Sequence, residues 1–401
     1  MLVLLLVVFV NFVGIGALIP VLPYTVIETL GLSATTMTLL LASFAFAMFL
    51  SNPLLGRLSD HVGRRPVLIF SLMVNVLAHI WFALSTDIVQ MFAARILAGL
   101  AAGNTGVIQA MIADRVNPGE RARYMGLFGA AIGTGFVAGP ALGGLFSGLG
   151  EGPLHQAPFL LAAGFGTIAL LLSLRLNGRA TKATASIATK TLLLDWIKIV
   201  LRSELALYAL AFFCLNLSFA QIEASYVLLL RDYLGFGAAK SGWLFAYIGV
   251  CIILVQSVLI NVAVRRFGEV GTVVFGASLL LIGQGLTVLI SLGFMVGANY
   301  PLVQIVTTTT AVCFGFGFSN PALSAAASNA AGKATMGGAL GTVQGFASLG
   351  QVGGLILAGP LYQLGGAHFP FGFGVCITSL LLFVMIVLKR RPAMQPQCRQ
   401  Q

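Results

Sequence analysis

The residues of this chain best suited to chemistry are ionisable side chains that lie inside long apolar runs. Arg95 and Glu223 are such residues, in a chain of 401 residues of which only 8% are charged. Each costs about 3 kcal/mol at the centre of a bilayer on insertion scales, so each is expected to face a cavity or a partner. Burial makes a carboxyl easier to protonate near neutral pH, so Glu223 is the preferred candidate for binding a proton.

Glu223 shares one face of a predicted helix with other polar and aromatic residues. Asn216 precedes it by about two turns, and Phe219 and Tyr226 flank it at i−4 and i+3. This pattern predicts an acidic, aromatic stripe. Plainer alternatives stay open, because Glu223 can be a neutral carboxyl that only holds helices together and Arg95 can bond to carbonyls of the first helix.

Composition indicates the elements that position these residues. The chain is 58% hydrophobic, soluble domains carry roughly 25% charged residues, and apolar runs of about 20 residues recur along the chain. We predict an all-α polytopic membrane protein with 12 transmembrane helices in two pseudo-symmetric six-helix bundles. The predicted spans are 2–27, 34–56, 66–86, 89–113, 124–149, 158–175, 204–230, 239–264, 270–293, 300–328, 336–363 and 369–388.

These spans divide the chain into four parts: an N-terminal bundle (1–175), a polar basic linker (176–203), a C-terminal bundle (204–388) and a basic tail (389–401). Lys and Arg gather in alternate loops, so the positive-inside rule places both termini and the linker in the cytoplasm. The net charge of +11 therefore need not indicate nucleic acid. The spacing of the five cysteines suggests no disulfide framework or metal site, and no cofactor is expected.

The two halves echo each other in sequence. Gly63 matches Gly268 at an offset of 205 residues, and the same offset carries Asn11 onto Asn216. Gly139-Pro140 matches Gly359-Pro360 at an offset of 220 residues. Two related six-span halves are typical of secondary transporters, whose substrate binds near the midplane between them. Motifs of enzymes and ATP-driven pumps, such as HExxH, GxSxG and the Walker lysine motif, do not occur.

A charged segment, GRLSDHVGRRP from Gly56 to Pro66, separates the second and third predicted spans. Its charges cannot lie in hydrocarbon, so it is expected to be a turn at the membrane surface. Gly56 and Gly63 allow close helix approach and a tight turn. Asp60 can accept hydrogen bonds from a helix N-terminus or from Arg64. The remaining residues of interest are Arg65 and, at the cytoplasmic end of the fourth span, Asp114.

The fifth predicted span contains GTGFVAGPALGG, from Gly133 to Gly144. Small residues at every fourth position form a bare face on which another helix backbone can pack. Pro140 removes a backbone hydrogen bond and is expected to bend the helix. The glycines of interest are Gly135, Gly139, Gly143 and Gly144.

These motifs resemble those of the major facilitator superfamily. GRLSDHVGRRP matches its loop between spans two and three, and RILAGLAAG, with Arg95, Gly99 and Gly103, resembles its fourth-span motif. GTGFVAGPALGG and GIGALIPVLP resemble the fifth and first spans of twelve-span drug:proton antiporters, such as tetracycline and multidrug exporters. The resemblance covers most of the first half. The second half matches only in span count, a degenerate loop and the Gly359-Pro360 echo.

The resemblance implies roles for the motifs. The charged loop would act as a relay that latches the cytoplasmic side in the outward-facing state, and the fifth span would be a hinge and seal between the halves. The alternatives are that Arg64 and Arg65 only set the topology and that the glycines only pack helices. The residues expected to line the substrate cavity are Asn11, Asn216, Phe219, Glu223 and Tyr226.

One position departs from the family. Many relatives carry a carboxylate in the first span where this chain has Asn11, and an amide cannot bind or release a proton. The other carboxylates near the expected path are Glu223, Asp114 and Glu28. We therefore take Glu223, with Asp114 and Arg95, as the candidates for proton coupling.

The function expected from these patterns is proton-coupled export of amphipathic or lipophilic small molecules by a monomer in the cell inner membrane. Twenty-nine phenylalanines and few buried charges suit an apolar cavity. One alternative is a proton-independent uniporter or importer of a neutral metabolite, which Asn11 favours. The other is a non-transporting membrane sensor.

Overall fold

The computed structural model describes residues 1–117, 120–147, 156–176, 205–294, 301–331 and 336–390, and all regular elements in these ranges are helices. Most of the predicted linker and tail lie outside the described residues. The first half contains α1 (Leu2–Ala17), η1 (Tyr24–Thr29), α2 (Ala34–Val62), α3 (Arg64–Leu84), α4 (Ile88–Ala102), α5 (Thr105–Ala113), α6 (Arg121–Phe146) and α7 (Gln156–Leu174). The second contains α9 (Leu205–Leu234), α10 (Ala238–Leu254), η4 (Val255–Leu259), α11 (Ile260–Ser291), α12 (Pro301–Ala331), α13 (Met336–Gly365) and α14 (His368–Arg390).

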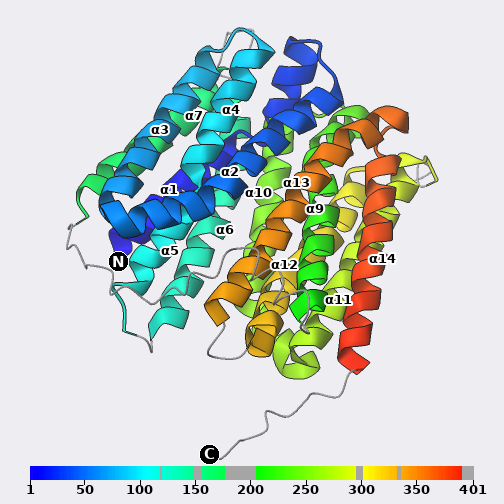
Figure 1. Ribbon diagram of the computed structural model, residues 1–401. Helices are drawn as coiled ribbons and strands as arrows, with labels where there is room; N and C mark the ends of the chain where they lie inside the picture. Colours follow the sequence, from blue (N-terminus) through cyan, green and yellow to red (C-terminus); the bar gives the residue numbers. More distant parts are fainter. Residues whose placement is uncertain (118–119, 148–155, 177–204, 295–300, 332–335, 391–401) are drawn as a thin grey trace, which may run out of the picture.

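The helices form two groups side by side, α1 to α7 in blue to green and α9 to α14 in green to red (Figure 1). Nine helical stretches in the described residues are long and apolar enough to cross a membrane. One of them, Ala238–Ser291, covers two of the predicted spans, while α1 is shorter and α13 is not among the nine. The all-helical fold is therefore as predicted, and twelve spans with cytoplasmic termini stay a prediction.

Two glycines turn the chain at matching places in the two halves. Gly63 separates α2 from α3 with a φ of 106°, and Gly268 breaks α11 with a φ of 70°. Residues with a Cβ rarely adopt positive φ, so both sites require glycine. Because the two glycines are related by the offset of 205 residues, the backbone repeats the echo seen in the sequence.

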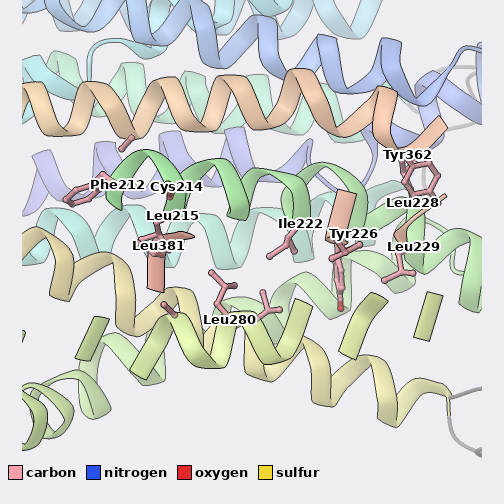
Figure 2. Close-up of a cluster of buried hydrophobic side chains, with 14 of the residues drawn as sticks. Phe212, Cys214, Leu215, Ile222, Tyr226, Leu228, Leu229, Leu280, Tyr362 and Leu381 are labelled. Atoms are coloured by element: carbon pink, nitrogen blue, oxygen red, sulfur yellow. The ribbon is translucent and has the colours of Figure 1, made fainter. Parts of the chain in front are cut away.

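The second half is built around α9, most of whose side chains are buried. Leu215 of α9, Leu280 of α11 and Leu381 of α14 lie in one cluster, which is shown in Figure 2. A second cluster occupies the first half, between α1, α3, α4 and α5. The first of these clusters also contains residues of the first half, such as Leu22, Met37 and Phe82, so the two halves share one buried apolar cluster.

Two pairs of helices connect the halves. A Cβ added to Gly144 of α6 would lie 2.6 Å from the Cα of Gly242 of α10. A Cβ added to Gly359 of α13 would lie 2.5 Å from the Cα of Thr35 of α2. Backbones this close leave no room for a side chain at either glycine, while Val137 of α6 packs against Gly249 of α10 and Thr38 of α2 packs against Gly359.

Candidate functional site

In the middle of the protein, the accessible surface of α9 is confined to one stripe of side chains. Between residues 211 and 230, Phe213, Asn216, Phe219 and Glu223 are half-buried, and every other residue is buried. Their spacing puts them on one helical face. The accessible surface of this otherwise buried helix is therefore a narrow band that ends in a carboxylate.

Among the described residues, Glu223 has one hydrogen-bond partner and interacts with one charge. Gln351 of α13 donates its Nε2 to Glu223 Oε2 at 3.2 Å. Arg95 of α4, in the other half, interacts with Glu223 electrostatically. No direct ion pair between the two is found among the described residues.

Arg95 is buried, with its guanidinium carbon 4.6 Å from the centre of the Phe44 ring. Its Nε and Nη1 atoms have no hydrogen-bond partner in the described part of the chain. The alternative role for Arg95 is hydrogen bonding to carbonyls of the first helix. Neither of these two nitrogens makes such a bond among the described residues. A buried cation without hydrogen bonds is costly, so the stacking on Phe44 and the field of Glu223 are its compensation.

The remaining predicted cavity residues divide into two groups. Phe219 stacks on Phe316 of α12 with 3.8 Å between ring centres, and Asn216 donates to the Phe212 carbonyl of its own helix. Both share the accessible stripe with Glu223. Tyr226 does not, because it is buried and its hydroxyl bonds to Thr309 Oγ1.

Asn11 is buried inside the first bundle, where its Oδ1 accepts a hydrogen bond of 3.0 Å from Asn75 of α3. His79 lies one turn beyond Asn75 and is also buried. Asn11 therefore links α1 to α3. It is not part of the accessible stripe, and its position contributes no group that can carry a proton.

The charged turn brings three of the predicted residues together. Arg64 Nη1 lies 2.5 Å from Asp60 Oδ1, and Arg64 Nε lies 3.3 Å from Asp114 Oδ2 at the end of α5. Arg65 Nη2 donates to the carbonyl of Leu174, the last residue of α7. The sequence offers Asp60 two partners, a helix N-terminus or Arg64. In the structure Asp60 pairs with Arg64.

Gly56 is placed differently from the expectation. A Cβ added there would meet no atom within 4 Å, so no helix approaches closely at this residue in this conformation. Gly99 and Gly103 instead hold α4 against α2, since added Cβ atoms would lie 2.8 Å from Ala47 Cβ and from Asn52 N.

The glycines of α6 lie on two different faces. Gly135, Gly139 and Gly143 pack on α1 of the same half, and an added Cβ at Gly139 would lie 2.8 Å from Gly16 Cα. Gly144 faces α10 of the other half. The repeated glycines therefore pack helices within one bundle, and contact with the other bundle falls to Gly144.

Polar contacts also join the halves, at the end of the protein opposite to the charged turn. Tyr24 of η1 donates to the Phe236 carbonyl at 2.6 Å and lies 2.9 Å from Ser241 Oγ. Thr35 of α2 donates to Gln363 of α13 at 2.8 Å. With the predicted orientation this is the outer end, so the conformation is closed toward the outside.

Sequence reasoning missed several of these residues. Gln351 stands in a glycine-rich apolar run, and Tyr24 is one aromatic residue among many. The one available signal for Gln351 is that it is an amide within an otherwise apolar stretch of predicted helix. Such a signal does not identify a partner 128 residues away in the chain.

Comparisons with known proteins agree with the fold and the motifs. The family model described as Major Facilitator Superfamily matches residues 4–318. Multidrug resistance protein 2 of Bacillus subtilis (strain 168) is 28% identical over 390 residues, covering 96% of this chain and 94% of that protein. The class H tetracycline resistance protein of Pasteurella multocida is 32% identical over 289 residues, covering 70% and 71% of the two chains.

Solved structures show the same fold at lower identity. The human organic anion transporter MFSD10 (TETRAN) has a TM-score of 0.71 and 23% identity, with 96% of this chain and 98% of that chain covered. The nucleoside transporter NupG has a TM-score of 0.77 and 15% identity, with 98% and 99% covered. With a family model that matches most of its length, the chain belongs to the major facilitator superfamily, a family of transporters, as a multi-pass transporter of the inner membrane.

Proposed function

We propose that this transporter exports amphipathic or lipophilic, drug-like small molecules in exchange for protons, by alternating access. The names of its relatives, multidrug and tetracycline resistance proteins, support the substrate class. The observation that carries the proton exchange is the position of Glu223. It is a half-buried carboxylate on the accessible stripe of α9, in the field of a buried cation from the other half.

Alternating access is supported by the arrangement of the contacts between the halves. Tyr24, Thr35, Gly144 and Gly359 all join the halves toward the predicted outer end. Rocking the two bundles about their interface would open this end and close the end that carries the charged turn. Such a movement would also separate the apolar cluster that the two halves share.

Proton exchange follows from the electrostatics of Glu223. The carboxylate in its ionised form is stabilised by Gln351 and by Arg95. A cationic substrate near Glu223 replaces the proton, and a proton replaces the substrate on the opposite side. The membrane potential adds about 2.3 kcal/mol per 100 mV for each charge carried fully across.

The proton-independent uniporter is the second candidate, because Asn11 is tied to Asn75 and supplies no proton site. The experiment that separates the two uses proteoliposomes with an imposed pH gradient and tetracycline and ethidium as probes. We expect Glu223→Gln to abolish accumulation driven by the gradient and to retain probe binding. If the variant still concentrates a probe in response to the gradient, Glu223 is a structural residue and the proposed coupling is wrong.

A further inference from the structure

Gln351 is a half-buried polar residue on α13 that lies beside Glu223. Its Nε2 lies 3.2 Å from Glu223 Oε2, and both side chains are half-buried. An amide N–H that donates to a carboxylate favours the ionised form, and it does so more strongly away from bulk water. Gln351 therefore acts directly on the charge of Glu223.

Close packing of α13 on α9 holds the donor in place. A Cβ added to Gly350, just before Gln351, would lie 3.1 Å from the Cα of Phe213. A Cβ added to Gly354, one turn from Gly350, would lie 2.7 Å from the carbonyl oxygen of Leu217. Because glycines bracket Gln351, the two backbones run close together and the amide is fixed opposite Glu223.

The same stretch of α13 also contacts the other half. A buried cluster joins three helices, with two alanines from α2, two from α9 and three residues from α13. Its members are Ala42, Ala45, Ala220, Ala224, Val352, Leu355 and Ala358. Val352 follows Gln351 directly, and Ala220 and Ala224 flank Glu223, so the hydrogen bond lies beside the contact between the halves.

We propose that Gln351 is a positioning residue that stabilises the ionised form of Glu223 against its burial and transmits the loss of that charge to α13, the helix that joins the halves. This inference rests on the proposed function, in which Glu223 binds the proton. When a proton from water forms the O–H bond of the carboxylic acid, the amide either keeps a weaker bond to the remaining carbonyl oxygen or turns its own carbonyl oxygen to accept the new O–H. Either response changes the strength or the direction of the bond that links α9 to the segment of α13 packed on α2.

Few other groups act on Glu223. The charge that faces it from α4 is that of Arg95, and α2 presents alanines to the adjoining cluster. From α12, Phe316 approaches the same stripe through its stacking on Phe219. Among these groups, Gln351 is the one that bonds to the carboxylate directly.

The test measures ethidium binding to the purified full-length protein as a function of pH, by fluorescence. We expect Gln351→Leu to move the midpoint of the profile to higher pH by about one unit, because the ionised form loses a donor. Gln351→Met, also without a donor, should give the same shift and replaces the leucine variant if that one does not fold. The matched control is Gln344→Leu, an exposed glutamine two turns earlier on α13, which should leave the midpoint unchanged.

A double substitution distinguishes the role of Gln351 from that of Glu223 as the proton site. If Gln351 acts through Glu223, Gln351→Leu causes no further shift in a Glu223→Gln background. If the midpoint is unchanged in both Gln351 variants while Glu223→Gln gives a flat profile, Glu223 is still the proton site but the proposed role of Gln351 is wrong. A normal profile in Glu223→Gln overturns the proton site itself, and with it this inference.

Discussion

Arg95 of α4 and Glu223 of α9 interact across the two halves, and each would be an isolated charge without the other. Two nitrogens of Arg95 have no hydrogen-bond partner among the described residues, so little besides Phe44 and Glu223 compensates its charge. Removing one member of a buried pair leaves an uncompensated charge, which costs more than removing both. The two residues should therefore depend on each other for stability.

A double-mutant cycle tests this dependence. We expect Arg95→Met and Glu223→Gln each to destabilise the protein, and the double variant to be more stable than the sum of the two predicts, by about 1 kcal/mol. The measurement is unfolding of the purified protein in detergent. Asp114→Asn combined with Arg95→Met is the control pair and should be additive. Additivity for Arg95 and Glu223 as well would mean that the two charges do not stabilise each other.

The sequence predicted these residues better than it predicted their surroundings. Arg95 and Glu223 could be found because a charge in an apolar run is rare, and Gly63 because a charged turn needs a break. The burial of Asn11 and Tyr226 could not be predicted in the same way. An all-apolar helix has no polar face, so its sequence does not tell which side meets the cavity and which meets another helix.

At the scale of elements, α6 is packed between α1 of its own half and α10 of the other half. The glycine pattern in its sequence predicted close packing but not which partner each glycine meets. Gly144 and Gly242 form a contact with the second half near the predicted outer end, where the bundles are closed. Added bulk at this contact should therefore affect the closed conformation more than the fold.

Gly144→Ala tests this contact. We expect the added methyl group to push α10 away and favour opening toward the outside, because its Cβ would lie 2.6 Å from Gly242 Cα. The measurement is labelling of Thr35→Cys by a membrane-impermeant maleimide, in a chain whose five native cysteines are replaced by serine. Gly133→Ala is the matched control on α6, since its Cβ would meet no atom within 4 Å. Equal labelling in both variants would show that Gly144 does not control the outer closure.

At the scale of the whole molecule, the closed outer end and the charged turn lie at opposite ends of the bundles. The cluster of Arg64, Asp60 and Asp114 is complete within the first half in this conformation. Asp60 keeps 49% of its side-chain surface exposed. That surface is free to be covered when the cytoplasmic ends come together, which agrees with a latch for the outward-facing state.

Asp60→Asn should therefore bias the transporter toward the inward-facing state and reduce transport without reducing expression. The expected shift in the conformational equilibrium is at most about fivefold, because a contact that covers a surface carboxylate such as Asp60 contributes about 1 kcal/mol or less. Accessibility of a single cysteine at the cytoplasmic end reports the shift, and turnover in proteoliposomes reports the loss. Unchanged accessibility together with unchanged turnover would leave Arg64 and Asp60 as residues that only set the topology.

The bare contact between Gly144 and Gly242 also bears on how fast the halves can exchange positions. Interlocked side chains must separate before two helices slide, so they add to the activation barrier. At Gly144 and Gly242 no side chain has to disengage, whereas farther along the same two helices Val137 of α6 packs against Gly249 of α10 and must withdraw first. The packing between α6 and α10 would therefore govern the frequency of switching, whereas the polar bonds of Tyr24 and Thr35 would govern the time spent in each state.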